Sequence, residues 1–253
     1  MSLRYTPLIS ICCCTFNATL RIKELLDSIY NQTYDNIEVV VVDGASKDNT
    51  LDIVKAYQRE NDILISEPDK GVYDAMNKAL KLAHGDYLIF MGADDHLLSY
   101  DVIRRVVEAI EKDGANEDSI YYGNVYGEKN GNIWKKDFSK WDWVRGTICH
   151  QCIFYPKNIY KEYSYDLRYS INADYAYNLG LVGTANFRHI DVAVSYFSYG
   201  GISGSNRIDI EWKKDCAGLM REKLGFGPYL YRKIREWSRK FIKLPLQKMK
   251  EIK

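Results

Sequence analysis

The sequence predicts an α/β fold built on a doubly wound, mostly parallel sheet. Short apolar runs alternate with segments of helical spacing through the first 113 residues, as expected when helices connect parallel strands. The run at 37–42, IEVVVV, is rich in β-branched residues and apolar on both faces, which is typical of a strand inside a parallel sheet. With 253 residues, 46% of them hydrophobic, the chain can bury a sizeable core.

The elements of this first part follow from hydrophobic periodicity and capping residues. Strands are expected at 8–14, 37–42, 63–66 and 87–91. Helices are expected at 20–31, 49–59, 72–83 and 101–112. Asp48 and Ser99 are expected to cap the second and fourth helices, because their side-chain oxygens can accept free backbone N–H groups.

After Gly114 the rhythm changes. Strands are expected at 120–126 and 133–138, a helix at 171–182 and a strand at 186–197. Aromatic residues are dense in this part. We interpret the shift as a change of role within one folded unit, so the predicted parts are 1–113, 114–205 and a C-terminal helical part, 206–253.

The C-terminal part is basic and amphipathic. Residues 221–253 hold eleven Lys or Arg against three Glu, a net charge of +8, which leaves −7 for the rest of a chain of net charge +1. Over 229–242, Leu230, Ile234, Trp237 and Phe241 share one helical face, and basic residues fill the other. Two interpretations stay open: the apolar stripe packs on the body, or the helix attaches peripherally to an anionic membrane surface. Nucleic acid is not expected as a partner.

Composition also bears on the compartment. The apolar run near the N-terminus is too short to span a bilayer, so we expect neither a signal peptide nor a transmembrane helix. Six cysteines without a secretory signal indicate a reducing compartment, the cytoplasm. Cys149 and Cys152 have the spacing of a zinc or redox motif, but two further ligands are lacking nearby, so neither is expected there.

Polar residues follow each of the four predicted strands. They include Thr15 after the first strand, Asp43 after the second, Asp69 after the third and Asp94 after the fourth. Because parallel strands deliver their carboxyl ends to one edge, these groups should converge. A single Asp there is commonly a turn or cap residue. Several carboxylates together would repel one another without a cation, and oxygen ligands favour Mg²⁺ or Mn²⁺, which commonly hold phosphates as well.

Four stretches then resemble a known family. They are TFN at 15–17, VVVVDGASKDNT at 39–50, EPDKGVYDAMNKAL at 67–80 and HGDYLIFMGADD at 84–95. In this order and spacing they resemble the motifs of family 2 glycosyltransferases with the GT-A fold, over roughly residues 8–205. The third stretch further resembles a bacterial branch that builds surface polysaccharides.

The resemblance assigns roles to the converging residues. It implies a donor site for a nucleotide-sugar formed by Thr15, Phe16, Asn17, Asp43, Lys70, Asp74, Asn77, Ala93 and Asp94. Asp43 is suited to accept a hydrogen bond from a base N–H such as that of uracil. Asp94 and Asp95 are the expected metal ligands at the family's DxD motif, in which Gly92 replaces the first Asp.

The general base should come from the second part of the chain. Asp174, in the first turn of a predicted helix, resembles the family's catalytic base, although Ala173 stands where an acidic residue often precedes it. Asp174 as a simple helix cap, and Asp166 as the base, are the alternatives. His150 and Gln151 resemble an HQ pair near the acceptor or sugar.

Two further features have open interpretations. The Gly/Ser-rich segment 199–205 is expected to be a lid over the diphosphate or a plain loop. Trp141 and Trp143 are either a sugar-stacking face or buried aromatics, the latter being commoner.

These expectations combine into one function. The sequence predicts a metal-dependent inverting glycosyltransferase that moves a sugar, most simply from a UDP-sugar, to a hydroxyl of a glycan or lipid-linked saccharide. It would work in bacterial surface polysaccharide synthesis, in the cytoplasm or peripherally on the inner face of the cytoplasmic membrane. The alternative is a non-catalytic nucleotide-sugar-binding relative that acts as a partner subunit. A phosphatase built around Asp43 is disfavoured, because Ala45 stands where a second Asp is needed.

Overall fold

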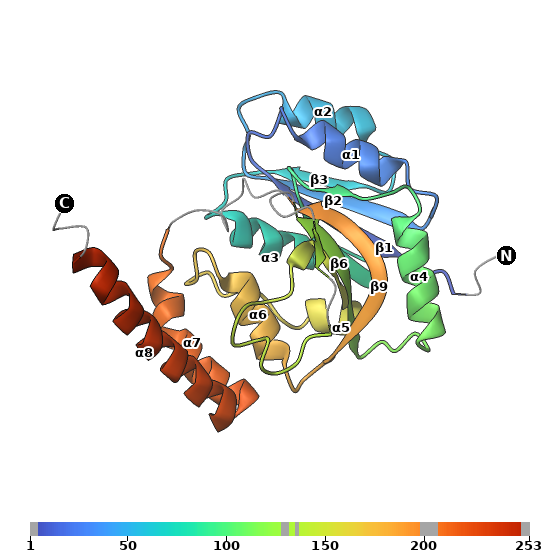
Figure 1. Cartoon of the computed structure of the whole chain (residues 1–253). Helices are drawn as coiled ribbons and strands as arrows, with labels where there is room; N and C mark the ends of the chain where they lie inside the picture. Colours follow the sequence, from blue (N-terminus) through green and yellow to red (C-terminus); the bar gives the residue numbers. More distant parts are fainter. Residues whose placement is uncertain (1–4, 128–131, 135–136, 198–206, 249–253) are drawn as a thin grey trace.

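The computed structural model describes residues 5–127, 132–134, 137–197 and 207–248. One mixed sheet runs through the molecule in the order β3-β2-β1-β4-β8-β6-β9-β5, with β7 paired to β6 outside this path. Helices cover both faces of its parallel part (Figure 1). The predicted α/β class and its mostly parallel sheet are confirmed.

The parallel half matches the predicted elements closely. Its strands are β1 (Ile9–Thr15), β2 (Ile37–Asp43), β3 (Ile63–Ser66) and β4 (Tyr87–Gly92). Its helices are α1 (Ile22–Tyr30), α2 (Thr50–Tyr57), α3 (Val72–Leu82) and α4 (Val102–Lys112). Helices α1 and α2 lie on one face of the parallel strands and α3 on the other (Figure 1). The interior residues of β1, β2 and β4 are almost wholly buried, which explains their apolar sequences.

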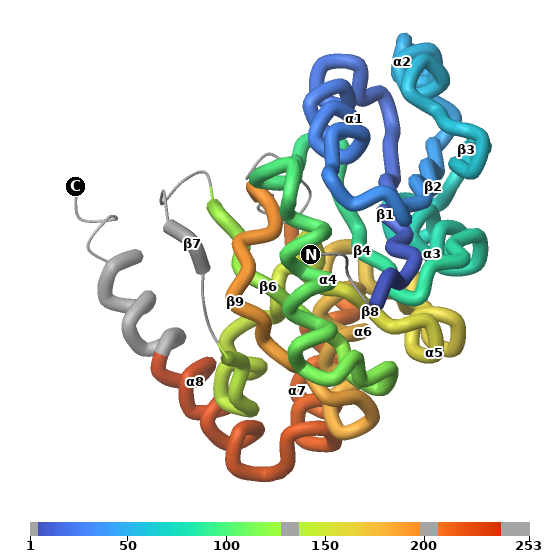
Figure 2. The backbone as a smooth tube through the Cα atoms, turned by 90° about the vertical axis from the view of Figure 1, so that its right-hand side faces the viewer, coloured from blue at the N-terminus to red at the C-terminus, as the bar shows by residue number. Residues whose placement is uncertain are grey.

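The second half turns the sheet from parallel to mixed. It contains β5 (His96–Leu97), β6 (Ser119–Gly127), β7 (Asn132–Trp134), β8 (Ile153–Pro156) and β9 (Asn186–Phe197). The helical pieces are η1 (His150–Cys152), α5 (Lys157–Tyr160) and α6 (Ala173–Leu181). Strand β8 pairs antiparallel with both β4 and β6, and β6 runs parallel to the long curved β9. This places η1 and α6 beside the end of the parallel half (Figure 2).

Two local predictions are wrong. The strand expected at 133–138 does not extend to Phe138, whose N–H donates to the Tyr122 hydroxyl (2.8 Å) outside any strand. Ser99 does not cap α4, because its hydroxyl donates to the Asp101 carboxylate instead of accepting a helix N–H. Asp48, by contrast, accepts the N–H of Thr50, the first residue of α2, at 3.1 Å.

The C-terminal part is a helical pair, α7 (Ile210–Leu224) and α8 (Phe226–Lys248), joined at Gly225, whose φ of 87° makes the sharp turn possible. The two helices lie side by side (Figures 1 and 2). Among the described residues, no helix is long and apolar enough to cross a membrane.

Helix α8 packs on the body with an unexpected face. The guanidinium of Arg232 donates to Sγ of Cys216 on α7 (3.2 Å) and to the Val144 carbonyl (3.5 Å), while Leu230 and Ile234 are 43% and 56% exposed. Packing of the apolar stripe on the body, one of the two interpretations of this segment, is therefore wrong over the described side chains.

Candidate active site

The carboxyl ends of the parallel strands meet as the sequence predicts. In register, Thr15 of β1 lies beside Asp43 of β2, and Asp43 lies beside Ser66 of β3. The Asp43 carboxylate accepts hydrogen bonds from the hydroxyls of Thr15 (3.1 Å) and Ser66 (2.7 Å). It also accepts the Ser46 N–H (2.8 Å) and the Ser46 hydroxyl. This one carboxylate therefore fastens three strand ends and the loop after β2.

These contacts leave Asp43 inside the protein. Its side chain is fully buried. Burial raises the pKa of this carboxyl, but the hydrogen bonds from Ser46, Ser66 and Thr15 outweigh that effect, and the pKa is lowered from its ordinary value. Both oxygens are already occupied by donors of the protein, so in this conformation Asp43 shapes the nucleoside side of the rim from behind.

Two adjoining cavities open in front of this rim. The first, of about 240 Å³, lies between the ends of β1 and β4, the start of α3, and η1. The second, of about 310 Å³, shares Cys14, Phe16 and Val72 with the first and extends toward Asp69 and Gly71. The Phe16 ring is 64% exposed at their common edge, which suits stacking on a base.

The glycine in place of the first DxD aspartate has a steric reason. A Cβ on Gly92 would lie 2.8 Å from Oδ2 of Asp95. That oxygen accepts the Gly92 N–H (2.9 Å) and the side-chain amide of Gln151 (3.0 Å). Asp95 is 2% exposed, and burial raises its pKa, against the lowering effects of Gln151 and of His150. Asp95 thus occupies the space of a side chain at 92 and joins the end of β4 to η1.

Asp94 differs from its neighbour. It is partly exposed and lines the first cavity, and within the described residues no hydrogen bond or ion pair holds its carboxylate. No group of three or more His, Cys, Asp or Glu that could hold a metal lies in the described ranges. One open carboxylate fits an ion such as Mg²⁺ or Mn²⁺ that takes its other ligands from a diphosphate and water. Asp94 is the residue that fits this role, whereas the buried Asp95 does not face the cavity in the same way.

The second half contributes a His–Asp pair. Nδ1 of His150, on η1, lies 3.5 Å from Oδ2 of Asp174 in the first turn of α6, with the two side chains 22% and 13% exposed. Oδ1 of Asp174 accepts the hydroxyl of Tyr73 (3.2 Å) and the Tyr175 N–H (2.8 Å). His150 and Tyr73 both line the first cavity. The predicted base is therefore one side chain away from the space that Asp94 lines.

Tyr73 links the two halves through its hydroxyl, which also donates to the Ile171 carbonyl (2.5 Å). Burial and the Asp174 charge raise its pKa far above the ordinary value, so it stays a neutral donor. The sequence analysis missed Tyr73 as a site residue, although it lies in the quoted third stretch. It likewise missed Asp69, which lines the second cavity, accepts the Gly71 N–H (2.8 Å) and lies against Gly44.

Other predicted donor residues hold the backbone. Asn17, at a φ of 48°, accepts the Lys47 N–H (2.9 Å) with its side-chain oxygen. Asp74 accepts the N–H of Lys70 (3.0 Å), which fixes the entry to α3, and the Lys70 side chain is exposed. Both amide groups of Asn77 bind the backbone of Tyr165, at 2.9 and 2.8 Å.

The remaining candidates separate in the same way. Asp166 pairs with Arg168 (2.7 Å), which lowers its pKa, and neither of the two cavities is lined by it. Trp143 is buried against Phe138 and Phe187, so the sugar-stacking interpretation is wrong for Trp143. The segment 199–205, expected as a lid or a loop, lies outside the described residues.

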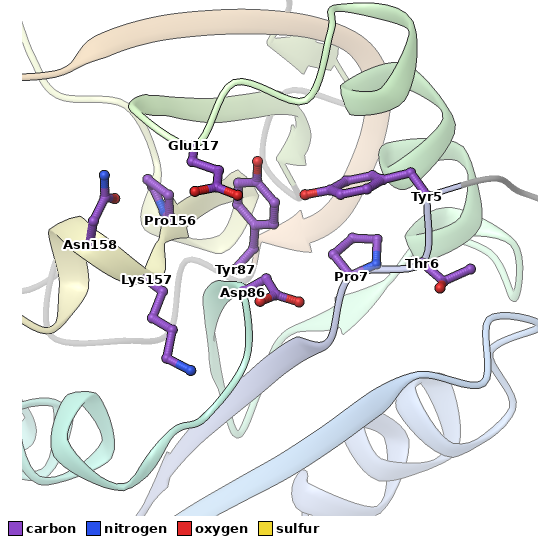
Figure 3. A pocket seen from close by; sticks show the side chains of 9 residues that line it. All are labelled: Tyr5, Thr6, Pro7, Asp86, Tyr87, Glu117, Pro156, Lys157 and Asn158. Carbon is purple, nitrogen blue, oxygen red and sulfur yellow. The ribbon is translucent and has the colours of Figure 1, made fainter.

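A separate hollow lies at the opposite edge of the sheet, where β1 and β4 begin (Figure 3). Its lining includes Tyr5, Asp86, Tyr87, Glu117 and Lys157, none of them a predicted site residue. Lys157 reaches the His84 carbonyl (2.8 Å) and Asp86 accepts the Leu8 N–H (2.8 Å), so both stabilise this end of the fold. We therefore place the candidate active site at the carboxyl ends of the strands.

Comparison with known proteins agrees with this placement. The model of the family described as Glycosyl transferase family 2 matches residues 10–168. A PGL/p-HBAD biosynthesis glycosyltransferase of Mycobacterium bovis is 36% identical over 209 residues, which cover 79% of this chain and 80% of that protein. The chondroitin synthase of Escherichia coli is 25% identical over 91% of this chain and 35% of its own length.

Solved structures show the same fold. S. aureus TarS 1-349 in complex with UDP-GlcNAc superposes with a TM-score of 0.71 at 21% identity, covering 85% of this chain and 66% of that one. The mannosyltransferase PcManGT from Pyrobaculum calidifontis, in complex with GDP-Man and Mn²⁺, gives 0.58 at 18% identity, covering 92% and 65%. This chain spans only 36% of the longer TarS structure. The architecture is thus that of the GT-A glycosyltransferases. Since the family model covers more than half of its length, this chain belongs to glycosyltransferase family 2, a class of inverting enzymes.

Proposed function

We propose that this enzyme transfers a sugar from a UDP-sugar to a hydroxyl of a glycan or lipid-linked saccharide, in bacterial surface polysaccharide synthesis. Residues 1–113 bind the donor, 114–205 bind the acceptor and supply the base, and 206–253 form a separate helical part. Support for UDP comes from the likeness to TarS, which was solved with UDP and with UDP-GlcNAc.

The observation that carries the proposal is the pairing of His150 with Asp174 beside the cavity lined by Asp94. Inverting transfer needs a base that removes the proton of the acceptor hydroxyl as that oxygen attacks the anomeric carbon. Asp174 has a carboxylate oxygen facing His150 and another held by Tyr73 and by the Tyr175 N–H. Asp174 is thereby oriented, and His150 and Gln151 lie where the acceptor would approach.

The leaving diphosphate needs charge stabilisation from the other side of the cavity. Asp94 would hold Mg²⁺ or Mn²⁺, and that ion, when bound, would neutralise the developing charge on the diphosphate. Phe16 would stack on the base, and Thr15 and Ala93 would border the nucleotide. Asn17, Asp43, Asp74 and Asn77 would keep the loops around the donor in place.

The test is a donor panel with the purified full chain. UDP-, GDP- and dTDP-sugars are incubated with candidate saccharide acceptors in Mn²⁺, Mg²⁺ or chelator, and the anomeric configuration of the product is read by NMR. Transfer from one UDP-sugar with inversion supports the proposal. Binding of UDP-sugars without turnover, on any acceptor, would instead favour the non-catalytic relative.

The place of work is part of the same proposal. A lipid-linked acceptor would be presented at the inner face of the cytoplasmic membrane, so we place the enzyme in the cytoplasm with peripheral attachment there. Activity that rises when the acceptor is embedded in vesicles, relative to detergent solution, is the expected result.

A further inference from the structure

Helix α8 turns an apolar stripe away from the body. We define the apolar stripe as Phe226, Leu230, Ile234 and Trp237, whose exposed fractions are 62%, 43%, 56% and 63%. Their spacing of four, four and three residues places them on one face of the helix. A surface helix of a globular protein normally buries such a face and exposes its charges. Here Arg232 points inward and the apolar stripe points outward.

Cations flank this stripe. The Arg221 guanidinium carbon and the Lys233 Nζ each lie 5.8 Å from the centre of the Tyr229 ring, which stands one residue before Leu230. Lys233 is exposed beside Ile234. The segment 221–253 carries a net charge of +8 against −7 for the rest of the chain, so the molecule would orient this end toward a negative surface.

This combination selects one kind of partner. A second copy of the chain would bring two strongly basic segments together, and like charges oppose that contact. Nucleic acid offers phosphates but no apolar interior for the stripe. An anionic lipid bilayer offers both a negative surface and an apolar interior directly beneath it.

We propose that α8 docks on an anionic membrane by inserting the apolar stripe, with Lys233 and Arg221 against lipid phosphates. The inference rests on the proposed function only for the choice of the cytoplasmic leaflet. Vesicle binding needs neither donor nor acceptor, so failure of the docking and failure of the transfer reaction are separate results.

The experiment is sedimentation of the full chain with vesicles of phosphatidylcholine, with and without phosphatidylglycerol. The wild type is expected to bind only the anionic vesicles. The double variant Leu230→Ser, Ile234→Ser should bind at least about a hundredfold more weakly, because two apolar side chains no longer leave water. Lys233→Glu should weaken binding by roughly tenfold or more. Tyr100→Ser, at a 59% exposed site far along the chain, and Lys55→Glu on α2 are the matched controls and should bind like the wild type.

Several outcomes would overturn the docking proposal. They are wild-type protein that stays in the supernatant with anionic vesicles, binding that survives the double variant, and equal loss in the controls. A concentration-dependent dimer in analytical ultracentrifugation that the double variant abolishes would assign the stripe to a second copy. Thermal unfolding of every variant checks that the fold is intact. If the double variant is unfolded, Lys233→Glu decides, since loss of charge-dependent binding in a folded protein supports membrane docking and unchanged binding rejects it.

Discussion

At the scale of single residues, Asp174 is the side chain on which the chemistry should depend most. Its two oxygens are held by different partners, His150 on one side and Tyr73 with the Tyr175 N–H on the other. An Asn at 174 keeps the shape and can still accept hydrogen bonds, but it cannot take a proton. Asp174→Asn should therefore lower kcat by roughly 10²- to 10⁴-fold, with the donor KM changed by less than about twofold.

The matched control is Asp166→Asn, which removes the carboxylate that pairs with Arg168 on the surface. Initial rates with saturating donor and acceptor give the comparison. Near-normal kcat in Asp174→Asn, or a collapse of kcat in Asp166→Asn, would transfer the role of base to Asp166.

Gly92 is the second residue with a specific expectation. A methyl group there would meet Oδ2 of Asp95 at 2.8 Å and push it away from the Gly92 N–H and the Gln151 amide. Because Asp95 is buried, Gly92→Ala should lower the free energy of unfolding by about 1–3 kcal/mol, measured by urea titration. Gly218→Ala on α7, where a Cβ meets nothing within 4 Å, should be neutral or stabilise by up to about 1 kcal/mol. Equal stability of the two variants would mean that Asp95 relaxes without loss.

At the scale of elements, Asp43 is what ties the ends of β1, β2 and β3 together. Its folded-state pKa is lowered, so the carboxylate contributes stability that is fully present above its ordinary value of 3.8 and is lost as the pH falls through the folded value. Asp43→Asn should lower the free energy of unfolding by about 1–3 kcal/mol at pH 7. The difference from wild type should be constant down to about pH 5 and shrink as the pH is lowered toward 3.

Urea unfolding at pH 7, 5 and 3 measures this difference. Asp52→Asn, an exposed residue in the first turn of α2, is the control and should change stability by less than about 0.5 kcal/mol at each pH. A difference for Asp43→Asn that grows on acidification would contradict the role given to this carboxylate.

The elements also show what the sequence could reveal. Strands β1 to β4 and helices α1 to α4 follow from local periodicity, and the expected ends differ from the observed ones by two residues or fewer. Short pieces such as β5, β8 and α5 exist because other strands pair with them or pack beside them, which local pattern does not encode. In the same way, the convergence of Asp43 and Asp94 at one rim was predictable from strand direction. The burial of Asp43 was not, because it depends on how the Ser46 and Ser66 side chains turn.

At the scale of the whole molecule, ligand binding should stabilise the folded state. A donor that binds only the native protein adds about 2.7 kcal/mol at a concentration of 100 Kd. We expect a UDP-sugar with Mn²⁺ to raise Tm by several degrees and chelator to remove most of that rise. In Asp94→Asn the Mn²⁺-dependent part should disappear, while Asp166→Asn should keep it.

Differential scanning fluorimetry checks this in one plate. A rise that is the same with Mn²⁺ and with chelator would show that the donor binds without the metal, and Asp94 would lose its assigned role. A GDP-sugar that stabilises more than every UDP-sugar would change the proposed donor class.

The bond between Asp95 and Gln151 has a consequence for anyone who would recombine this enzyme. It is a buried carboxylate on the donor half that is satisfied by an amide on the acceptor half. Exchange of residues 114–205 for the equivalent segment of a relative, an attractive way to change acceptor range, would leave a charge stranded in the core unless the incoming segment brings an amide to the same place. Chimeras should therefore be screened first for the residue that replaces Gln151, and only then for new specificity.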